Sequence, residues 1–325
     1  MKRREFISLV GAAATWPLTA SAQQGGKVAR IGFLGSASAS GSRGPVEAMR
    51  AGLRERGYIE GQNINIEYRW AEGDYSRLPG LVAELLQLNI DVLVTHGTPG
   101  TLAARRATTT VPIVMAISGD ALSTGLVTNL ARPEANVTGS TYFLSELNAK
   151  RLQWLKDIFP AVSKIAALSN PDNPVSKPIM TAMQSMGTSL KIGVEQFRLR
   201  APTELEAVFA AMAAQRMDAV VVTEDGEFAA NHQAIADLAI ARMLPSIGTS
   251  EFALAGGLIG YGVNVLELYR RAGHFVDRII KGSKAADLPI ERPTSFEFVI
   301  NLKTAKVLGL TVSPTVLLLA DRVIE

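Results

Sequence analysis

Cysteine is absent from this 325-residue chain, which excludes disulfide bonds, thiolate metal sites, cysteine nucleophiles and a lipid anchor attached through cysteine. Histidine occurs only at His96, His232 and His274, and no two of these have the spacing of metal ligands. The sequence has no H-E-x-x-H, Walker A or G-x-S-x-G motif, and Gly32-Phe33-Leu34-Gly35 is only a fragment of a dinucleotide fingerprint, since its third glycine is not in place. We therefore expect no metal, no cofactor and no catalytic constellation.

The chain also has little excess charge. Its formal net charge is +3, and 19% of its residues are charged, against 47% hydrophobic. Without residues 1–22, Lys+Arg falls from 33 to 30 and Asp+Glu from 30 to 29, which leaves +1. A near-neutral body has no reason to seek phosphate backbones, so nucleic acid is not an expected partner. The hydrophobic content suffices for two buried cores, and the length suits two α/β domains.

Residues 1–22 have the three parts of a signal peptide in the right order. A basic start (Lys2, Arg3, Arg4) precedes a short apolar stretch from Phe6 to Leu18, and Ala20-Ser21-Ala22 has the small-x-small pattern of a cleavage site. The run from Arg3 to Ile7 resembles a twin-arginine export signal, and an ordinary Sec leader is the alternative. We expect export to the periplasm and cleavage after Ala22, and no later segment is long and apolar enough for a stop-transfer helix.

After the leader, strand and helix patterns alternate. Apolar or alternating runs predict strands over residues 28–34, 63–70, 91–97, 112–117, 136–142, 164–170, 193–199, 219–224, 245–248 and 258–263. Apolar residues at helical spacing predict helices between them, near 46–56, 78–86, 146–158, 175–187, 203–215, 229–243 and 268–280. This pattern predicts two successive α/β units with mainly parallel sheets, each covered by helices on both faces. The change of lobe is expected near Tyr142, in a hinge of two or three short crossings.

Ligands of such sheets bind beyond the carboxyl ends of the strands. The residues that follow the predicted strands are short, polar or glycine, which suits direct hydrogen bonding to a small molecule. The candidate ligand-binding residues are Ser36, Ala37, Gly97, Thr98, Pro99, Ser118, Asp120, Tyr142, Asn170, Glu224, Asp225 and Thr249.

Each candidate also has a simpler structural role. The Gly97-Thr98-Pro99 turn leads into a helix N-terminus that favours a carboxylate, but Thr98 is also a candidate N-cap with Pro99 at the first helical position. Glu224 and Asp225 suit a ligand ammonium group or a solvated acidic loop. Asn170 is a candidate turn residue, and Tyr142 a candidate hinge-packing residue.

Three long stretches make the chain similar to a known family. They are GLRERGYIEGQNINIEYRWAEGD (52–74), GTPGTLAARRATTTVPIVMAISGDALSTGLVTNLARPEANVTG (97–139) and AGGLIGYGVNVLELYRRAGHFVDRIIKGSKAADLPIERPTSFEFVINLKTAKVLGLTV (255–312). With them the mature chain resembles the ABC transporter substrate-binding proteins related to the tryptophan- and tyrosine-binding group.

The resemblance implies a class I periplasmic-binding-protein fold with two Rossmann-like lobes and a ligand between them. We expect an N-terminal lobe of residues 27–141 plus about 264–289, and a C-terminal lobe of 142–263 plus about 290–325. The implied partners are a small-molecule ligand and an ABC permease with its ATPase at the inner membrane, and we expect a monomer.

In relatives, the loop that matches Thr98 and Pro99 meets the ligand carboxylate, and an acidic residue near Asp225 meets an amino group. This chain departs from that pattern at Ser118-Gly119-Asp120-Ala121 and in its 224–228 loop, Glu-Asp-Gly-Glu-Phe. These departures speak against an α-amino acid as the ligand, whereas an aromatic or other small carboxylate remains open.

A transport receptor has two alternatives from other function classes. An effector-sensing regulator on the same fold needs a DNA-binding or signalling domain, and given the leader and the near-neutral body we expect neither. An exported two-domain enzyme of Rossmann-like fold needs a nucleotide-binding pattern or a paired acid and base, and the sequence shows neither. The sequence thus favours a binding protein that closes on a small molecule by hinge motion and hands it to the permease.

Overall fold

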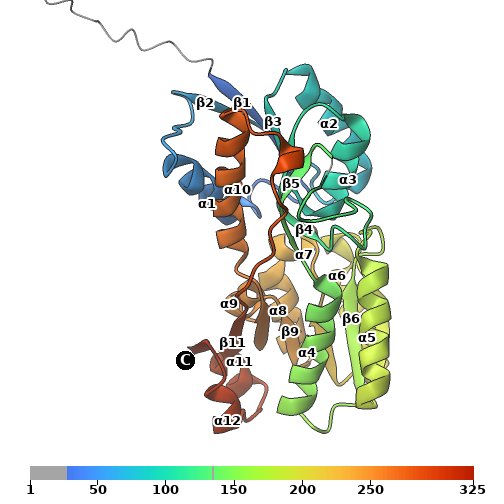
Figure 1. Cartoon of the computed structure of the whole chain (residues 1–325). Coiled ribbons are helices and arrows are strands. Elements are labelled where there is room, and N and C mark those ends of the chain that lie inside the picture. The colour runs from blue at the N-terminus through green and yellow to red at the C-terminus, as the bar shows by residue number, and fades with distance from the viewer. Residues whose placement is uncertain (1–27, 134) are drawn as a thin grey trace, which may run out of the picture.

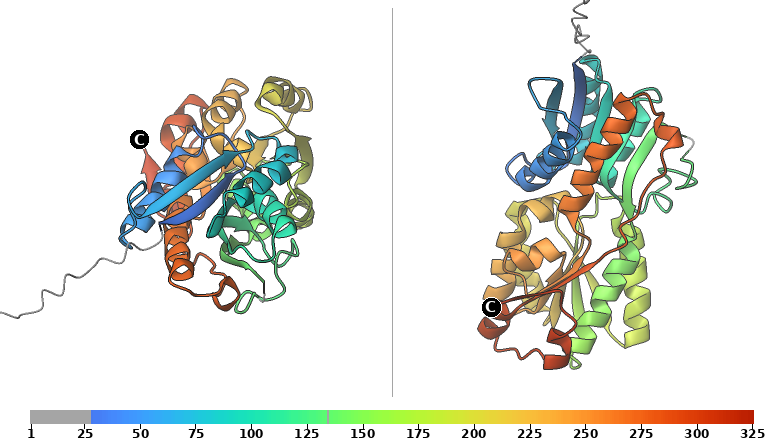
Figure 2. Two further views of the ribbon diagram at one scale, coloured as in Figure 1. Left: turned by 90° about the horizontal axis from the view of Figure 1, so that it is seen from above. Right: turned by 60° about the vertical axis from the view of Figure 1, so that its left-hand side comes forward.

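The computed structural model describes residues 28–133 and 135–325. The predicted signal peptide, with its cleavage site and export signal, lies outside these residues. The described chain forms two lobes stacked end to end, each with a twisted sheet between layers of helices (Figure 1, Figure 2).

The first lobe is built on a five-stranded sheet of order β2-β1-β3-β4-β5. Its strands are β1 (Ala29–Gly35), β2 (Ile64–Trp70), β3 (Val92–His96), β4 (Ile113–Gly119) and β5 (Val137–Tyr142). Every pairing in this sheet is parallel. The helices are α1 (Arg43–Arg54), α2 (Leu78–Gln87), α3 (Gly97–Ala107) and α10 (Val265–Ile280), with a 3-10 turn, η1, at Tyr75–Arg77. The apolar strand runs are buried because helices cover both faces of the sheet.

The second lobe has a seven-stranded sheet of order β12-β11-β10-β9-β8-β6-β7. Its strands are β6 (Lys164–Ser169), β7 (Gly193–Arg198), β8 (Ala219–Val222), β9 (Ser246–Gly248), β10 (Ile259–Gly262), β11 (Glu297–Asn301) and β12 (Arg322–Ile324). Its helices are α4 (Leu144–Ile158), α5 (Ser176–Leu190), α6 (Leu205–Ala214), α7 (Gly226–Ala230), α8 (His232–Ala241), α9 (Ser250–Leu254), α11 (Leu302–Val307) and α12 (Pro314–Leu317), with a 3-10 turn, η2, at Pro202–Glu204. A further 3-10 turn, η3 (Ala285–Asp287), follows α10 and contacts β5 of the first lobe. The β10–β11 pair is antiparallel, whereas the other pairs are parallel.

The chain passes between the lobes three times. It leaves the first sheet after β5, returns from β10 into α10, and runs back beside β5, where Glu291 bridges Ser140, before it enters β11. Helix α10 therefore follows the second lobe in sequence but packs in the first lobe against α1 and β4 (Figure 1). The α1–α10 contact is close because Gly52 faces Gly273, and a Cβ at Gly52 would lie 2.0 Å from the Arg270 carbonyl oxygen.

The structure differs from the sequence-based expectation in places, among them the short helix α9, which was not predicted. The single helix expected over 229–243 is two helices, α7 and α8, because the chain bends at Asn231 (φ −117°, ψ 19°). The elements after α10 were not predicted, since β11, α11, α12 and β12 are each six residues or shorter, and short segments carry a weak periodic signal.

Candidate functional site

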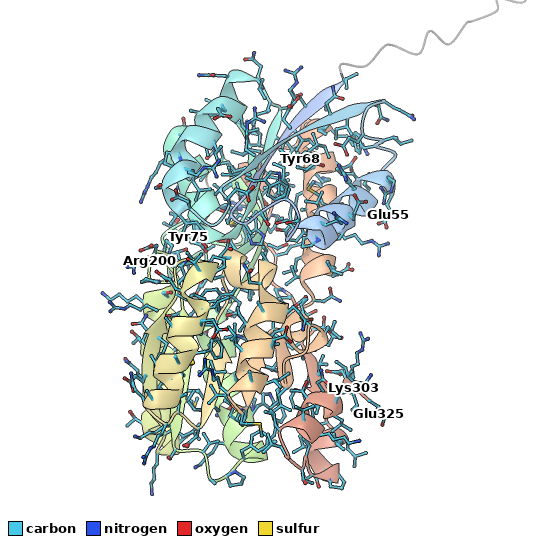
Figure 3. The ribbon with its side chains drawn as sticks, turned by 180° about the vertical axis from the view of Figure 1, so that it is seen from behind. Glu55, Tyr68, Tyr75, Arg200, Lys303 and Glu325 are labelled. Carbon is cyan, nitrogen blue, oxygen red and sulfur yellow. The ribbon has the colours of Figure 1, made fainter. Side chains whose placement is uncertain are left out.

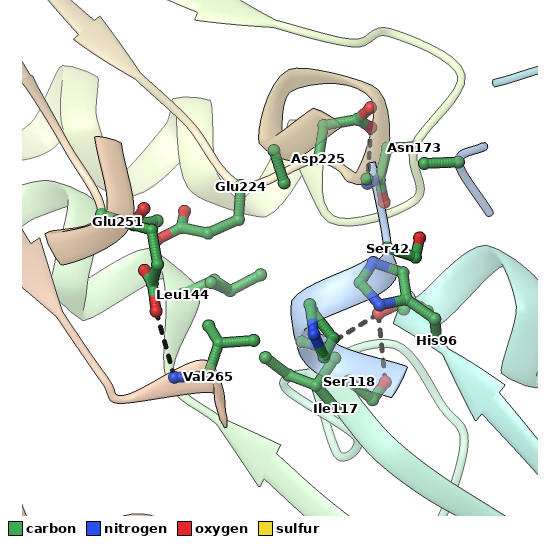
Figure 4. Close-up of a pocket in the computed structure, with 18 of the residues that line it drawn as sticks. Ser42, His96, Ile117, Ser118, Leu144, Asn173, Glu224, Asp225, Glu251 and Val265 are labelled. Carbon is green, nitrogen blue, oxygen red and sulfur yellow. Dashed lines mark hydrogen bonds between the residues drawn. The ribbon is translucent and has the colours of Figure 1, made fainter. Parts of the chain in front are cut away.

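A cavity of about 350 Å³ lies between the lobes, at the carboxyl ends of the strands (Figure 4). Both lobes contribute to its wall. The first lobe supplies residues from the start of α1, the end of β3, the start of α3 and the end of β4, and the second supplies residues from α4, the loops after β6 and β8, and α7 to α9. Apolar side chains line much of the wall, namely Ala37, Pro45, Ile117, Leu144, Val175, Ala229, Val265 and Leu266.

The first-lobe wall is centred on the start of α3. Gly97 has φ +74°, a conformation that only glycine adopts without strain, and it turns the chain from β3 directly into the helix. Thr98 is buried, and its Oγ1 accepts the Gly119 N–H at 3.1 Å and lies 3.2 Å from Ser118 Oγ. The first-turn N–H groups of α3 have no intrahelical acceptor and carry partial positive charge. This wall therefore offers N–H and hydroxyl groups to an anion.

The predicted N-cap role of Thr98 is wrong. Helix α3 already begins at Gly97, and the cap position belongs to His96, whose side chain makes no capping hydrogen bond. The Thr98 side chain instead ties the start of α3 to the end of β4. Thr98 is nevertheless one of the residues that line the cavity.

The second-lobe wall contains a buried ion pair. Arg151 of α4 is 0% exposed, and its Nη2 lies 2.6 Å from Glu224 Oε1. The other Glu224 oxygen accepts from Asn148 Nδ2 at 2.6 Å, and Arg151 Nε donates to the Tyr261 carbonyl at 2.9 Å. The charge and both oxygens of Glu224 are therefore compensated by the protein itself.

Asp225 is also fully engaged. It is the N-cap of α7, and its Oδ1 accepts the Glu227 N–H at 3.0 Å. Its Oδ2 accepts from Tyr75 Oη at 2.7 Å and from Asn173 Nδ2 at 3.0 Å. Burial nevertheless raises the pKa of the Asp225 carboxyl. The expected solvated acidic loop is thus wrong for this residue, which is 8% exposed.

Glu251 is the third carboxylate of the wall, and its own backbone N–H and the Thr249 side chain also interact with it. Its Oε1 accepts the Val265 N–H at 3.3 Å, and its Oε2 lies 3.4 Å from Ser250 Oγ. Both are long for bonds to a carboxylate, and burial raises the pKa of Glu251. Figure 4 shows Glu251 beside Glu224, with Val265 and Leu144 next to them. Glu251 is thus the wall carboxylate best able to accept a donor from a ligand.

Two histidines line the cavity in their neutral form. Burial lowers the pKa of His96 to about 4, and its Nδ1 is a hydrogen-bond partner of the Tyr269 hydroxyl. Burial, with a contribution from the Arg151 charge, lowers the pKa of His232 to about 4 as well. Among the cavity-lining residues that the structure describes there is no lysine or arginine. The cavity therefore combines an apolar body, one anion-accepting end and one acidic end.

Eight of the twelve candidate residues line the cavity: Ala37, Gly97, Thr98, Ser118, Tyr142, Glu224, Asp225 and Thr249. The other four do not. Ser36 donates to the His96 carbonyl at 2.7 Å, and Pro99 is buried in the first turn of α3. Asp120 and Asn170 accept N–H groups of their own turns, from Leu122 and Asp172 respectively.

The sequence reasoning missed lining residues at the starts of helices α1, α4 and α9. Ser42 and Pro45 come from the start of α1, Leu144 from α4, and Glu251 from α9. Asn173, three residues after the candidate Asn170, also lines the cavity, and its bond to Asp225 could not be inferred from the sequence.

Within residues 28–133 and 135–325, no cluster of three or more His, Asp or Glu side chains is arranged to hold a metal ion. In the same part of the chain, no helix has both the length and the hydropathy needed to cross a bilayer.

Comparisons with known proteins agree with this geometry. Residues 36–324 match the family model described as ABC transporter substrate binding protein. A tyrosine-binding protein of Clostridioides difficile is 24% identical over 259 residues, which cover 79% of this chain and 74% of the relative.

Solved structures match over nearly the whole length. One from Streptococcus pneumonia, described as an ABC domain in complex with L-Trp, has a TM-score of 0.83 at 26% identity and covers 91% of this chain and 99% of its own. A conserved domain protein of Vibrio cholerae has a TM-score of 0.85 at 23% identity, with coverage of 91% and 100%. At that identity the second match supports the fold alone.

Proposed function

Because the chain belongs to the family of ABC transporter substrate-binding proteins, we propose that it is the solute receptor of an ABC importer and captures a small molecule between its lobes. Members of this family bind their substrates and are not enzymes. The observation that carries the proposal is the cavity of about 350 Å³ between the two lobes, lined by residues of both. A cavity of this size suits one small metabolite.

The ligand that suits this cavity is a small amino acid-like molecule with an apolar body, a carboxylate and an amine. The carboxylate would lie at the α3 N-terminus, where Gly97, Thr98 and Ser118 offer N–H and hydroxyl groups. The amine would lie near Glu251, whose hydrogen bonds to Val265 and Ser250 are long. Relatives that bind tyrosine or tryptophan support this class.

A plain aromatic acid suits the site less well than an amino acid. Three carboxylates, Glu224, Asp225 and Glu251, face the cavity, and only Glu224 has a cationic partner in Arg151. A ligand with a carboxylate and no cation would add a further negative charge to this wall, where the low dielectric strengthens repulsion. A ligand amine removes that cost.

We further propose that the ligand closes a hinge between the two lobes. The lobes have the residue bounds predicted from the sequence, 27–141 plus about 264–289 and 142–263 plus about 290–325. The three passages of the chain between the sheets, near Tyr142, Val263 and Glu291, support these bounds. A ligand that contacts both walls favours the closed form by its additional contacts there.

The cellular setting is also part of the proposal. The chain would be exported by its twin-arginine leader, cleaved after Ala22, and act in the periplasm as a monomer that delivers its ligand to a membrane permease and its ATPase. The family and the leader sequence support this setting.

A thermal-shift screen of residues 23–325 against the twenty amino acids and a set of aromatic acids tests the proposal. A ligand at a hundred times its dissociation constant should add about 2.7 kcal/mol to the free energy of unfolding. Thr98→Val should then weaken the ligand roughly tenfold, since a hydrogen bond to a charged group is lost. Thr181→Val, on the exposed face of α5, is the matched control and should bind normally. Stabilisation by none of these compounds would contradict the proposed ligand class.

A further inference from the structure

A direct hydrogen bond between side chains joins the two lobes at the edge of the cavity. The Tyr75 hydroxyl, from the first lobe, donates to Asp225 Oδ2 of the second lobe at 2.7 Å. The two residues are 150 positions apart in the sequence. Figure 3 shows Tyr75 at the junction between the lobes.

Each side of this contact is held firmly by its own lobe. Tyr75 begins η1, which Asp74 caps by accepting the Ser76 N–H at 2.9 Å, and its ring packs against the core of the first lobe. Asp225 is fixed by Asn173 and by the start of α7. The hydroxyl and the carboxylate therefore meet only when the two lobes are in this relative position.

The two lobes also approach each other closely beside this contact. A Cβ at Gly73 would lie 2.4 Å from Glu227 Oε2, and a Cβ at Gly41 would lie 2.4 Å from the Ala230 Cβ. Gly73 and Gly41 belong to the first lobe, whereas Glu227 and Ala230 belong to α7 of the second. The absence of side chains at these glycines allows the lobes to come close enough for the Tyr75 hydroxyl to reach Asp225.

We propose that Tyr75 and Asp225 form an interlobe latch that stabilises the closed form in the absence of ligand and slows ligand release. In this proposal Asp225 stabilises the closed form, and Glu251 binds the ligand amine. The effect on release rests on the proposed function, whereas the effect on lobe closure does not.

The chemistry of the pair supports a sizeable effect. Opening the lobes would replace a hydrogen bond to a buried carboxylate by bonds to water, a change that corresponds to roughly a tenfold to hundredfold shift in the closed-to-open ratio. Burial and the nearby Asp225 charge raise the pKa of Tyr75 well above its usual value, so the hydroxyl keeps its proton. Tyr75 remains a donor throughout the physiological pH range.

The absence of cysteine makes a direct test simple. Arg106→Cys in α3 and Gln184→Cys in α5 place one exposed label site on each lobe. Spin labels at these sites report the interlobe distance by electron-electron double resonance in ligand-free protein. We expect a distribution with a substantial short-distance population, and Tyr75→Phe should move most of it to longer distances. The control Tyr261→Phe, in β10 of the second lobe, should leave the distribution unchanged.

A second measurement separates the latch from a ligand contact. L-Tryptophan is the probe, and its dissociation rate is measured by stopped flow. If it binds, Tyr75→Phe should increase that rate by about tenfold or more. A ligand-free distance distribution that is the same in Tyr75→Phe and the parent protein would overturn the latch, even if tryptophan binding weakens. If L-tryptophan does not bind but Tyr75→Phe opens the ligand-free protein, the latch stands and only the proposed ligand fails.

Discussion

Replacement of Arg151 by methionine should destabilise the second lobe strongly. The Arg151 side chain is completely buried, and the Glu224 side chain is only 10% exposed. Arg151→Met keeps the apolar bulk but leaves Glu224 charged and without its cationic partner, and it removes the donor to the Tyr261 carbonyl. Loss of one partner of a buried ion pair costs about 3–5 kcal/mol. Against a typical stability of about 5–15 kcal/mol, this is a large fraction.

Urea unfolding followed by tryptophan fluorescence measures this cost, because Trp154 lies on the same helix as Arg151. The double variant Arg151→Met with Glu224→Gln should recover part of the loss, since the amide needs no cationic partner. Arg200→Met is the matched control, because the Arg200–Asp172 pair is exposed (54% and 55%) and exposed pairs contribute about 1 kcal/mol or less. A cost of Arg151→Met no larger than that of the control would refute the reasoning.

Three further outcomes are expected. Burial lowers the pKa of His232 to about 4, so as the pH falls the imidazole of the unfolded chain is protonated before that of the folded chain. Between pH 7 and pH 5 the free energy of unfolding of the wild type should therefore fall by about 2 kcal/mol relative to that of His232→Gln. A difference between the two proteins that does not change with pH would contradict this. In thermal unfolding, Gly52→Ala should cost about 1–3 kcal/mol because its Cβ meets the Arg270 carbonyl, whereas Gly80→Ala, with open space around it, should be neutral or stabilising. Glu251→Gln should weaken an amine-bearing ligand about tenfold in calorimetric titration, and unchanged affinity would remove Glu251 from the site.

The sequence was informative about the regular part of the fold. The first ten strands occur within about two residues of their predicted bounds, because each is an apolar or alternating run between turn residues. The two last strands were missed. β11 has an apolar centre of only three residues, from Phe298 to Ile300, and its pairing with β10 is antiparallel. Such a short segment becomes a strand through its neighbours in space, which local sequence does not reveal.

The site was predictable as a region but not residue by residue. Strand ends identified the correct loops, and Thr98, Ser118 and Thr249 line the cavity. Neighbouring residues of one turn point in different directions, so Asp120 and Asn170 bond within their own turns while Ser118 and Asn173 face the cavity. Which of two adjacent polar residues faces inward depends on the backbone geometry of the turn.

Acidic residues show the same limit. The adjacent pair Glu224 and Asp225 suggested a site for a ligand amine, but Arg151 and Tyr75 already engage them. Arg151 lies 73 positions from Glu224 in the sequence, and Tyr75 lies 150 positions from Asp225. Glu251, which lacks such a partner among the described residues, lies in a short helix that the sequence did not predict.

Calorimetric titration of residues 23–325 with the amino acid that stabilises them most tests the central claim most directly. We expect one binding site per chain, and a large loss of affinity in Ala37→Phe, because Ala37 is a buried lining residue and the larger side chain would occupy the cavity. Absence of binding heat for every amino acid tested, or equal affinity in folded Ala37→Phe, would contradict the claim that a small molecule is held between the lobes.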